Sequence, residues 1–210
     1  MEKNIKEFFI VILASAVLSI SFIYPKIEEF ENFLTFFSIF FIVLTANILV
    51  KKIVAKSLDI DIETKLWSVY YFWFREKDHL KRPLPMIWLP LSLSIFSSGF
   101  LQWFPILEFE EKARIERIAR RHELYRFSTV TEWHSGLIAF WGLFANILLF
   151  FLNFIIGFSE FAKISLFYSI WLLLPLSRLD GSKILFGSRK LWVFSCILVL
   201  ISLVVFSFSF

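Results

Sequence analysis

The sequence contains one cysteine and three histidines in 210 residues. The single cysteine, Cys196, excludes an intrachain disulfide and any metal cluster built on cysteines. His79 and His134 are too far apart to share a helical turn, and His122 is followed four residues later by Arg126. The chain therefore lacks HExxH, the pattern in which two histidines on one helix face bind zinc and a glutamate acts as general base.

The sequence also lacks a concentrated basic region. Its 22 lysines and arginines exceed its 18 acidic residues by four, but they are spread over several loops between apolar runs. A nucleic-acid-binding protein gathers such residues on one basic face. We therefore expect no nucleic-acid partner. No internal repeat or low-complexity linker divides the chain, so we expect a single domain over residues 1–210.

Apolar residues dominate the composition. Hydrophobic residues make up 58% of the chain and aromatic residues 20%, more than in an average soluble domain. We expect an all-α polytopic protein of the cell membrane, in contact with the lipid bilayer. About six hydrophobic segments are predicted, at residues 8–24, 33–50, 84–107, 135–157, 161–176 and 191–210.

The first apolar run, 8–24, is either a cleaved signal peptide or a transmembrane helix. Ala14-Ser15-Ala16 has the small residues of a signal-peptide cleavage site, but it lies in the middle of the run instead of after it. We therefore predict an uncleaved first transmembrane helix.

Segment 84–107 is long enough to cross a membrane but is interrupted. Its interrupting residues are Pro85, Pro90, Ser97, Ser98, Gly99 and Pro105. If the segment kinks or re-enters, all the lysine- and arginine-rich loops fall on one side, which is the cytoplasmic side by the positive-inside rule. This predicts five full crossings with a cytoplasmic N-terminus.

Two segments outside the apolar runs have distinct patterns. Residues 59–67 alternate between apolar and charged side chains, which predicts a strand. The aromatic stretch that follows to Phe74 is a second strand or an interfacial segment, and we favour a small β-hairpin over 59–74 at the membrane surface. Residues 108–126 are rich in charge with an apolar stripe, which favours a helix along the interface or a solvated connector.

The most informative stretch is 169–187, in which an apolar run ends at Pro175 and Asp180 follows beside Gly181. A carboxylate near membrane depth is a candidate functional residue. The alternative is a loop aspartate that caps the next helix through backbone amides.

This stretch resembles the second signature of the site-2 proteases, which are intramembrane zinc metalloproteases. Their pattern NxxPxxxLDG supplies the third zinc ligand through its aspartate. Pro175, Leu179, Asp180 and Gly181 match it, whereas Leu172 stands where the family has asparagine.

Two weaker similarities accompany this one. The run from Lys51 to Lys56, followed by the alternating strand, is similar to the end of the family's HExxH helix, which places Asn47, Ile48 and Lys51 at the positions of the first histidine, the glutamate and the second histidine. Residues 142–149 are similar to another family helix and keep its asparagine as Asn146. For Asn146 the alternative is a helix-packing amide.

The resemblance implies a vestigial site of Asn47, Lys51, Asp180 and Asn146, with no metal and no catalytic residue. A lone Asp180 at this depth needs compensation. We therefore predict that Lys51, or Lys52 if the register slips by one, pairs with Asp180 in place of zinc. In the alternative, Asp180 is exposed to water and caps the segment 183–190, while the lysines extend to the lipid headgroups.

These observations leave three hypotheses for the function. The first is a non-catalytic pseudoprotease that binds or scaffolds transmembrane segments of other proteins. The second is an active metalloprotease in which Asp180 binds zinc with His134 or His122, and Glu132 or Glu123 is the base. The third is a permease or channel lined by polar residues. Those polar residues are Asn47, Gln102, Asn146 and Asn153.

Overall fold

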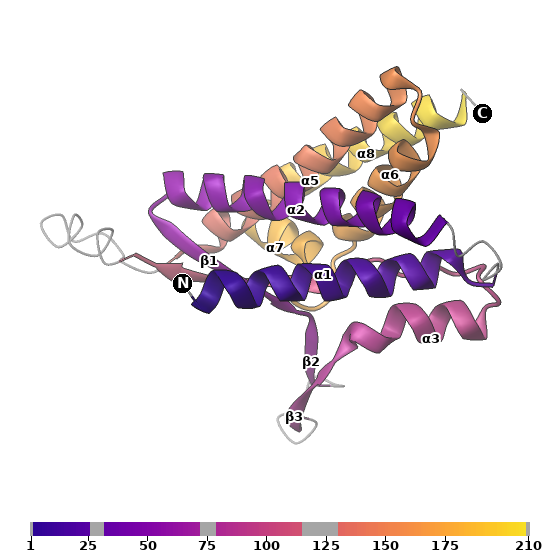
Figure 1. Cartoon of the computed structure of the whole chain (residues 1–210). Coiled ribbons are helices and arrows are strands. Elements are labelled where there is room, and N and C mark those ends of the chain that lie inside the picture. The colour runs from indigo at the N-terminus through magenta and orange to yellow at the C-terminus, as the bar shows by residue number, and fades with distance from the viewer. Residues whose placement is uncertain (1, 26–31, 72–78, 115–129, 209–210) are drawn as a thin grey trace, which may run out of the picture. The chain divides into compact units, whose positions relative to one another are not determined.

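The fold is described from a computed structural model, which describes residues 2–25, 32–71, 79–114 and 130–208. It is mostly helical, with two small sheets (Figure 1). In chain order the elements are α1 (Glu2–Ile23), α2 (Phe33–Ser57), β1 (Ile60–Leu66), β2 (Ser68–Tyr71), β3 (His79–Pro85), the 3₁₀ helix η3 (Met86–Trp88), α3 (Leu89–Phe96), β4 (Leu107–Ala113), α5 (Glu132–Ile156), α6 (Ser159–Leu173), α7 (Asp180–Gly187) and α8 (Arg189–Ser207).

Four helices are long and apolar enough to cross a membrane: Ile5–Ile23 within α1, and all of α2, α5 and α8. They match four of the six predicted hydrophobic segments. The segment predicted at 161–176 forms α6, whose 15 residues rise about 22 Å, less than the roughly 30 Å of a bilayer's hydrocarbon core. The five predicted crossings are therefore not all observed: within the described part of the chain, four helices are long enough to span the bilayer.

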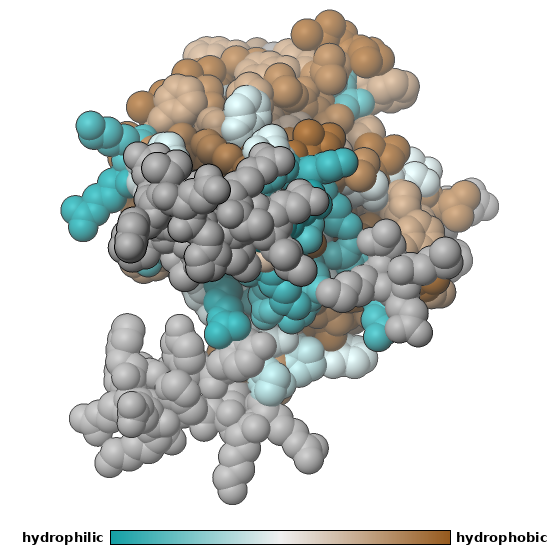
Figure 2. Space-filling model, turned by 90° about the vertical axis from the view of Figure 1, so that its left-hand side faces the viewer, coloured by the Kyte–Doolittle hydropathy of each residue, from teal (hydrophilic) through white to brown (hydrophobic). Residues whose placement is uncertain are grey.

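Apolar side chains on the candidate spans are exposed at the protein surface. Ile53 of α2, Ile155 of α5 and Leu200 of α8 have exposed fractions of 67%, 79% and 60%. Figure 2 shows broad apolar areas on one face of the molecule. Such surfaces are unfavourable in water and suit contact with lipid.

The described residues gather into two compact units. The first consists of Met1–Phe41 and Lys65–Glu108. In it α1 packs against α3, and the hydroxyls of Ser21 and Ser94 lie 2.6 Å apart. Ser21 also donates a hydrogen bond to the carbonyl of Pro90. These bonds satisfy polar groups at the contact between the two helices.

Segment 84–107 is interrupted as the sequence predicts. It contains the end of β3, the turn η3 and the eight-residue helix α3, which rises only about 12 Å. After α3, Ser98 and Gly99 have φ angles of 52° and 82° and end the helix. No helix in this segment is long enough to cross the membrane.

Strand β1 is confirmed, but the predicted hairpin at 59–74 is wrong. The burial of β1 alternates, with Ile60, Ile62 and Thr64 buried. Its partner is β4, not the following aromatic segment, in which β2 pairs antiparallel with β3. Because no glycine, proline, asparagine or aspartate lies between β1 and β2, the chain has no turn at which β2 could fold back onto β1.

The predicted interfacial helix at 108–126 is wrong over its first residues, which form β4; residues 115–126 lie outside the described part. Tertiary pairing overrides the weak strand preference of this charged segment. Lys112 of β4 binds Glu63 of β1 at 2.9 Å, and Arg114 binds Asp61 at 2.6 Å. Opposite charges on the two strands therefore fix their register.

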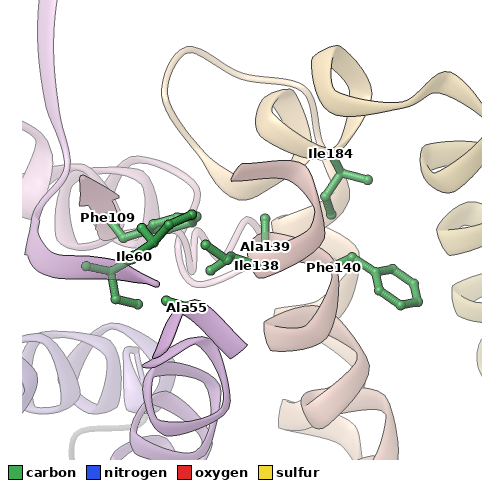
Figure 3. Close-up of a cluster of buried hydrophobic side chains, with 8 residues drawn as sticks. Ala55, Ile60, Phe109, Ile138, Ala139, Phe140 and Ile184 are labelled. Atoms are coloured by element: carbon green, nitrogen blue, oxygen red, sulfur yellow. The ribbon is translucent and has the colours of Figure 1, made fainter. Parts of the chain in front are cut away.

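The second unit consists of Ile42–Thr64 and Phe109–Phe210. In it α5 packs against α6, α7 and α8 (Figure 1). A buried cluster joins the end of α2 and the two strands to α5 and α7. Its members are Ala55, Ile60, Ile62, Phe109, Ile138, Ala139, Phe140 and Ile184. Figure 3 shows Ala55, Ile60, Phe109 and Ile138 gathered where α2, β1, β4 and α5 meet.

Candidate functional site

Asp180 is positioned by the turn between α6 and α7. Pro175 cannot continue α6, which ends at Leu173, and Ser177 turns the chain with a φ of 45°. At Gly181 a Cβ atom would lie 2.4 Å from the carbonyl oxygens of Leu173 and Leu174. A glycine is therefore required for the first turn of α7 to pack on the end of α6, and this contact fixes Asp180.

Lys51 of α2 forms an ion pair with Asp180. Its Nζ lies 2.5 Å from Oδ2 of Asp180, and the two side chains are 8% and 1% exposed. The predicted ion pair is confirmed, with Lys51 as the partner that the resemblance favours. The capping alternative is not observed, because α7 has no side-chain cap and Asp180 is its first residue.

The stem of Lys51 passes over a glycine of α5. A Cβ atom at Gly142 would lie 2.4 Å from Cε of Lys51 and 3.1 Å from Nδ2 of Asn47. Asn47 and Lys51 are one helical turn apart and thus share a face of α2. The missing side chain of Gly142 therefore provides the space in which Lys51 reaches Asp180.

A second pair of charges lies next to the first. Lys183 donates hydrogen bonds to the backbone carbonyl of Phe109 and, at 2.8 Å, to Oε1 of Glu111. The Nζ atoms of Lys183 and Lys51 lie 3.5 Å and 4.9 Å from the centre of the Phe109 ring. Both ammonium groups thus gain a favourable contact with the same aromatic ring.

Two of the predicted site residues are buried asparagines. Asn47 is 2% exposed and Asn146 is fully buried. Within the described part of the chain, no hydrogen-bond partner is found for Nδ2 of Asn47, for either polar atom of the Asn146 amide or for Oδ1 of Asp180. All four predicted site residues therefore lie buried in the second unit, and a direct contact joins two of them, Lys51 and Asp180.

The other predicted candidates lie elsewhere. His134 and Glu132 are at the start of α5, where His134 is hydrogen-bonded to Thr131. His122 and Glu123 lie outside the described residues. Asn153, proposed to line a path, donates instead to the carbonyl of Leu149 on its own helix.

The residues around Asp180 do not fit zinc. Within the described ranges, no three histidine, cysteine, aspartate or glutamate side chains gather closely enough to hold a metal. The group that contacts Asp180 is an ammonium, which offers only hydrogen-bond donors and repels a cation. This arrangement can join two helices through opposite charges, but it supplies no ligand set.

Sequence reasoning missed Phe109, Gly142, Lys183 and Glu111 as neighbours of the ion pair. Gly142 lies within the stretch 142–149, whose resemblance points to Asn146. The charge pattern of 108–126 predicts a helix, and no local pattern indicates that Phe109 and Glu111 face α7.

Comparison with known proteins finds no family model that matches the chain, no similar curated protein and no similar solved structure.

Proposed function

We propose that this chain is a multi-pass protein of the cell membrane that keeps the site-2 protease fold without its zinc chemistry, and that binds or scaffolds transmembrane segments of other proteins. Its N-terminus lies in the cytoplasm.

The observation that carries the proposal is the contact between Lys51 and Asp180. The resemblance aligns these residues with two zinc ligands of the protease, although they are 129 residues apart in sequence. A chance alignment gives no reason for two such distant residues to meet inside the protein. Their separation of 2.5 Å supports the alignment.

The same contact supports the absence of catalysis. An ammonium replaces the aligned second histidine, an amide replaces the first and Ile48 replaces the general base. A protonated lysine 2.5 Å from Asp180 neutralises the carboxylate that a metal would need. The pair thus holds α2 to α7 in the way that a structural cation would.

Rebuilding the motif tests the relationship. Asn47→His, Ile48→Glu and Lys51→His together restore HExxH on α2. We expect the purified triple variant to bind about one zinc ion per chain, because three ligands then converge, and to lose it on Asp180→Ala. The matched control moves the motif by one residue, with Ile48→His, Leu49→Glu and Lys52→His, and should bind little zinc.

Three outcomes would overturn the proposal. A folded triple variant that binds no zinc, or that keeps its zinc after Asp180→Ala, would show that these positions do not correspond to the zinc ligands of the protease. Stoichiometric zinc in the unchanged protein, lost on Asp180→Ala, would instead establish the metalloprotease alternative.

The scaffolding role is tested by photo-crosslinking in cells. Trp141 of α5 is 40% exposed beside Gly142, so a photoreactive residue there should form adducts with transmembrane segments of other membrane proteins. Ile155, near the far end of the same helix, is the matched control. Adducts with lipid alone at Trp141 would contradict the role.

Thiol labelling tests the topology. Single cysteines at Lys81 in β3 and Lys112 in β4, in a Cys196→Ser background, should react from the cytoplasmic side. The reason is that α3 is too short to carry the chain across the membrane. Reaction from opposite sides would show that segment 84–107 crosses.

A further inference from the structure

Four buried polar atoms near the ion pair have no hydrogen-bond partner among the residues that the structure describes. They are Nδ2 of Asn47, Nδ2 and Oδ1 of Asn146, and Oδ1 of Asp180. These residues are 2%, 0% and 1% exposed. Buried polar atoms nearly always have a hydrogen-bond partner, because leaving them without one is costly in free energy. A partner from outside the chain is therefore expected.

These atoms lie around the contact of α2 with α5. The position that a Cβ atom would take at Gly142 lies close to the side chains of both Asn47 and Lys51. Asn146 is four residues after Gly142, so it lies one turn away on the same face of α5. Lys51 in turn contacts Oδ2 of Asp180, whose other oxygen has no partner. Asn47 and Asp180 thus both lie beside Lys51, and Asn146 lies one turn further along the face of α5 that carries Gly142.

The charges of this region decide which ligand fits. Lys51 and Asp180 compensate each other at 2.5 Å. An additional ion would leave an uncompensated charge inside the protein. The asparagine amides offer both donors and acceptors, and the carboxylate oxygen accepts. A neutral molecule that donates and accepts hydrogen bonds matches all of them.

We propose that Asn47, Asn146 and Oδ1 of Asp180 hold buried water beside the Lys51–Asp180 ion pair. Water can donate a hydrogen bond to Oδ1 of Asp180, and it can both donate to and accept from the asparagine amides. Buried waters typically make about three hydrogen bonds. The site is independent of the proposed function, since it follows from the unpartnered atoms alone.

Water-edited solid-state NMR of the full chain in lipid bilayers tests the site. In protein labelled with ¹⁵N-asparagine, we expect magnetisation from water to reach the side-chain amides of Asn47 and Asn146 several-fold faster than that of Asn153. Asn153 is the matched control, because it is also buried on α5 but donates to the carbonyl of Leu149. Equal slow transfer at all three would overturn the proposal.

A substitution separates one shared site from two unrelated ones. Asn146→Leu should slow water transfer to Asn47, because it removes two of the groups that hold the shared water. Asn153→Leu should leave that transfer unchanged. Full transfer to Asn47 in a folded Asn146→Leu variant would overturn the shared site. If this variant does not fold, the measurement on the unchanged protein still decides whether water is present.

Discussion

The Lys51–Asp180 pair and the ion pairs of the β1–β4 sheet contain the same kinds of charged groups in different surroundings. The side chains of Lys51 and Asp180 are 8% and 1% exposed, whereas those of Arg114 and Asp61 are 29% and 58% exposed. In the exposed pair, water solvates either charge when its partner is lost. In the buried pair, each group depends on the other, because few other groups solvate its charge.

Breaking the buried pair should have the largest effect. Lys51→Met or Asp180→Asn should each lower the free energy of unfolding by about 3–5 kcal/mol, because each leaves the other polar group stranded. Unfolding of the detergent-solubilised protein measures this. The double variant should lose less than the sum of the single losses. Strictly additive losses would show that the two residues do not stabilise each other.

The pair of Lys183 and Glu111 lies between the two extremes, with side-chain exposures of 15% and 17%. Lys183→Met removes a charged donor from both Glu111 and the carbonyl of Phe109, so we expect a loss of about 1.5–3 kcal/mol. Glu111→Gln should cost less, since the bond to Phe109 remains. The same unfolding measurement compares them, and a larger loss for Glu111→Gln would refute this order.

Gly142→Ala disturbs the buried pair without removing a charge. The added Cβ would lie 2.4 Å from Cε of Lys51, so Lys51 must shift, and we expect a loss of about 1–3 kcal/mol. In a Lys51→Ala background the space is open, and the same substitution should cost much less. An equal cost in both backgrounds would mean that Gly142 serves another contact.

The exposed pair should have the smallest effect. Removing Arg114 and Asp61 by Arg114→Met and Asp61→Asn should give a coupling free energy below about 1 kcal/mol. The coupling should weaken further at high salt, whereas that of Lys51 and Asp180 should not. Urea or detergent unfolding at two salt concentrations checks both statements. Equal salt dependence of the two pairs would show that burial does not shield Lys51 and Asp180 from salt.

Much of this fold follows from local pattern. The helices α1, α2, α5 and α8 arise from long apolar runs, and β1 from strict alternation, because these periodicities decide which surface can be buried. The partner of β1 could not be predicted in this way. Charge pairs with a strand far along the chain, such as Arg114 with Asp61, appear only when the two are brought together.

The site was predictable only in part. Lys51 and Asp180 emerged because a charge at this depth needs compensation and because the motif placed both residues. The roles of Gly142 and Phe109 could not be found from sequence. A glycine in a membrane helix packs against many possible neighbours, and the aromatic ring reaches the lysines only through the pairing of β4 with β1.

The sequence distance between Lys51 and Asp180 has a consequence for biosynthesis. At roughly 5–20 residues per second, the ribosome adds the 129 residues that separate them in about 6–26 s. During this time α2 is complete, but Asp180 has not yet been synthesised. Lys51 lies within two turns of the end of α2 at Ser57, so its long side chain can extend to the headgroups until α7 is made. The salt bridge between Lys51 and Asp180 can therefore form only after the ribosome has synthesised the start of α7, when all the preceding helices are already present.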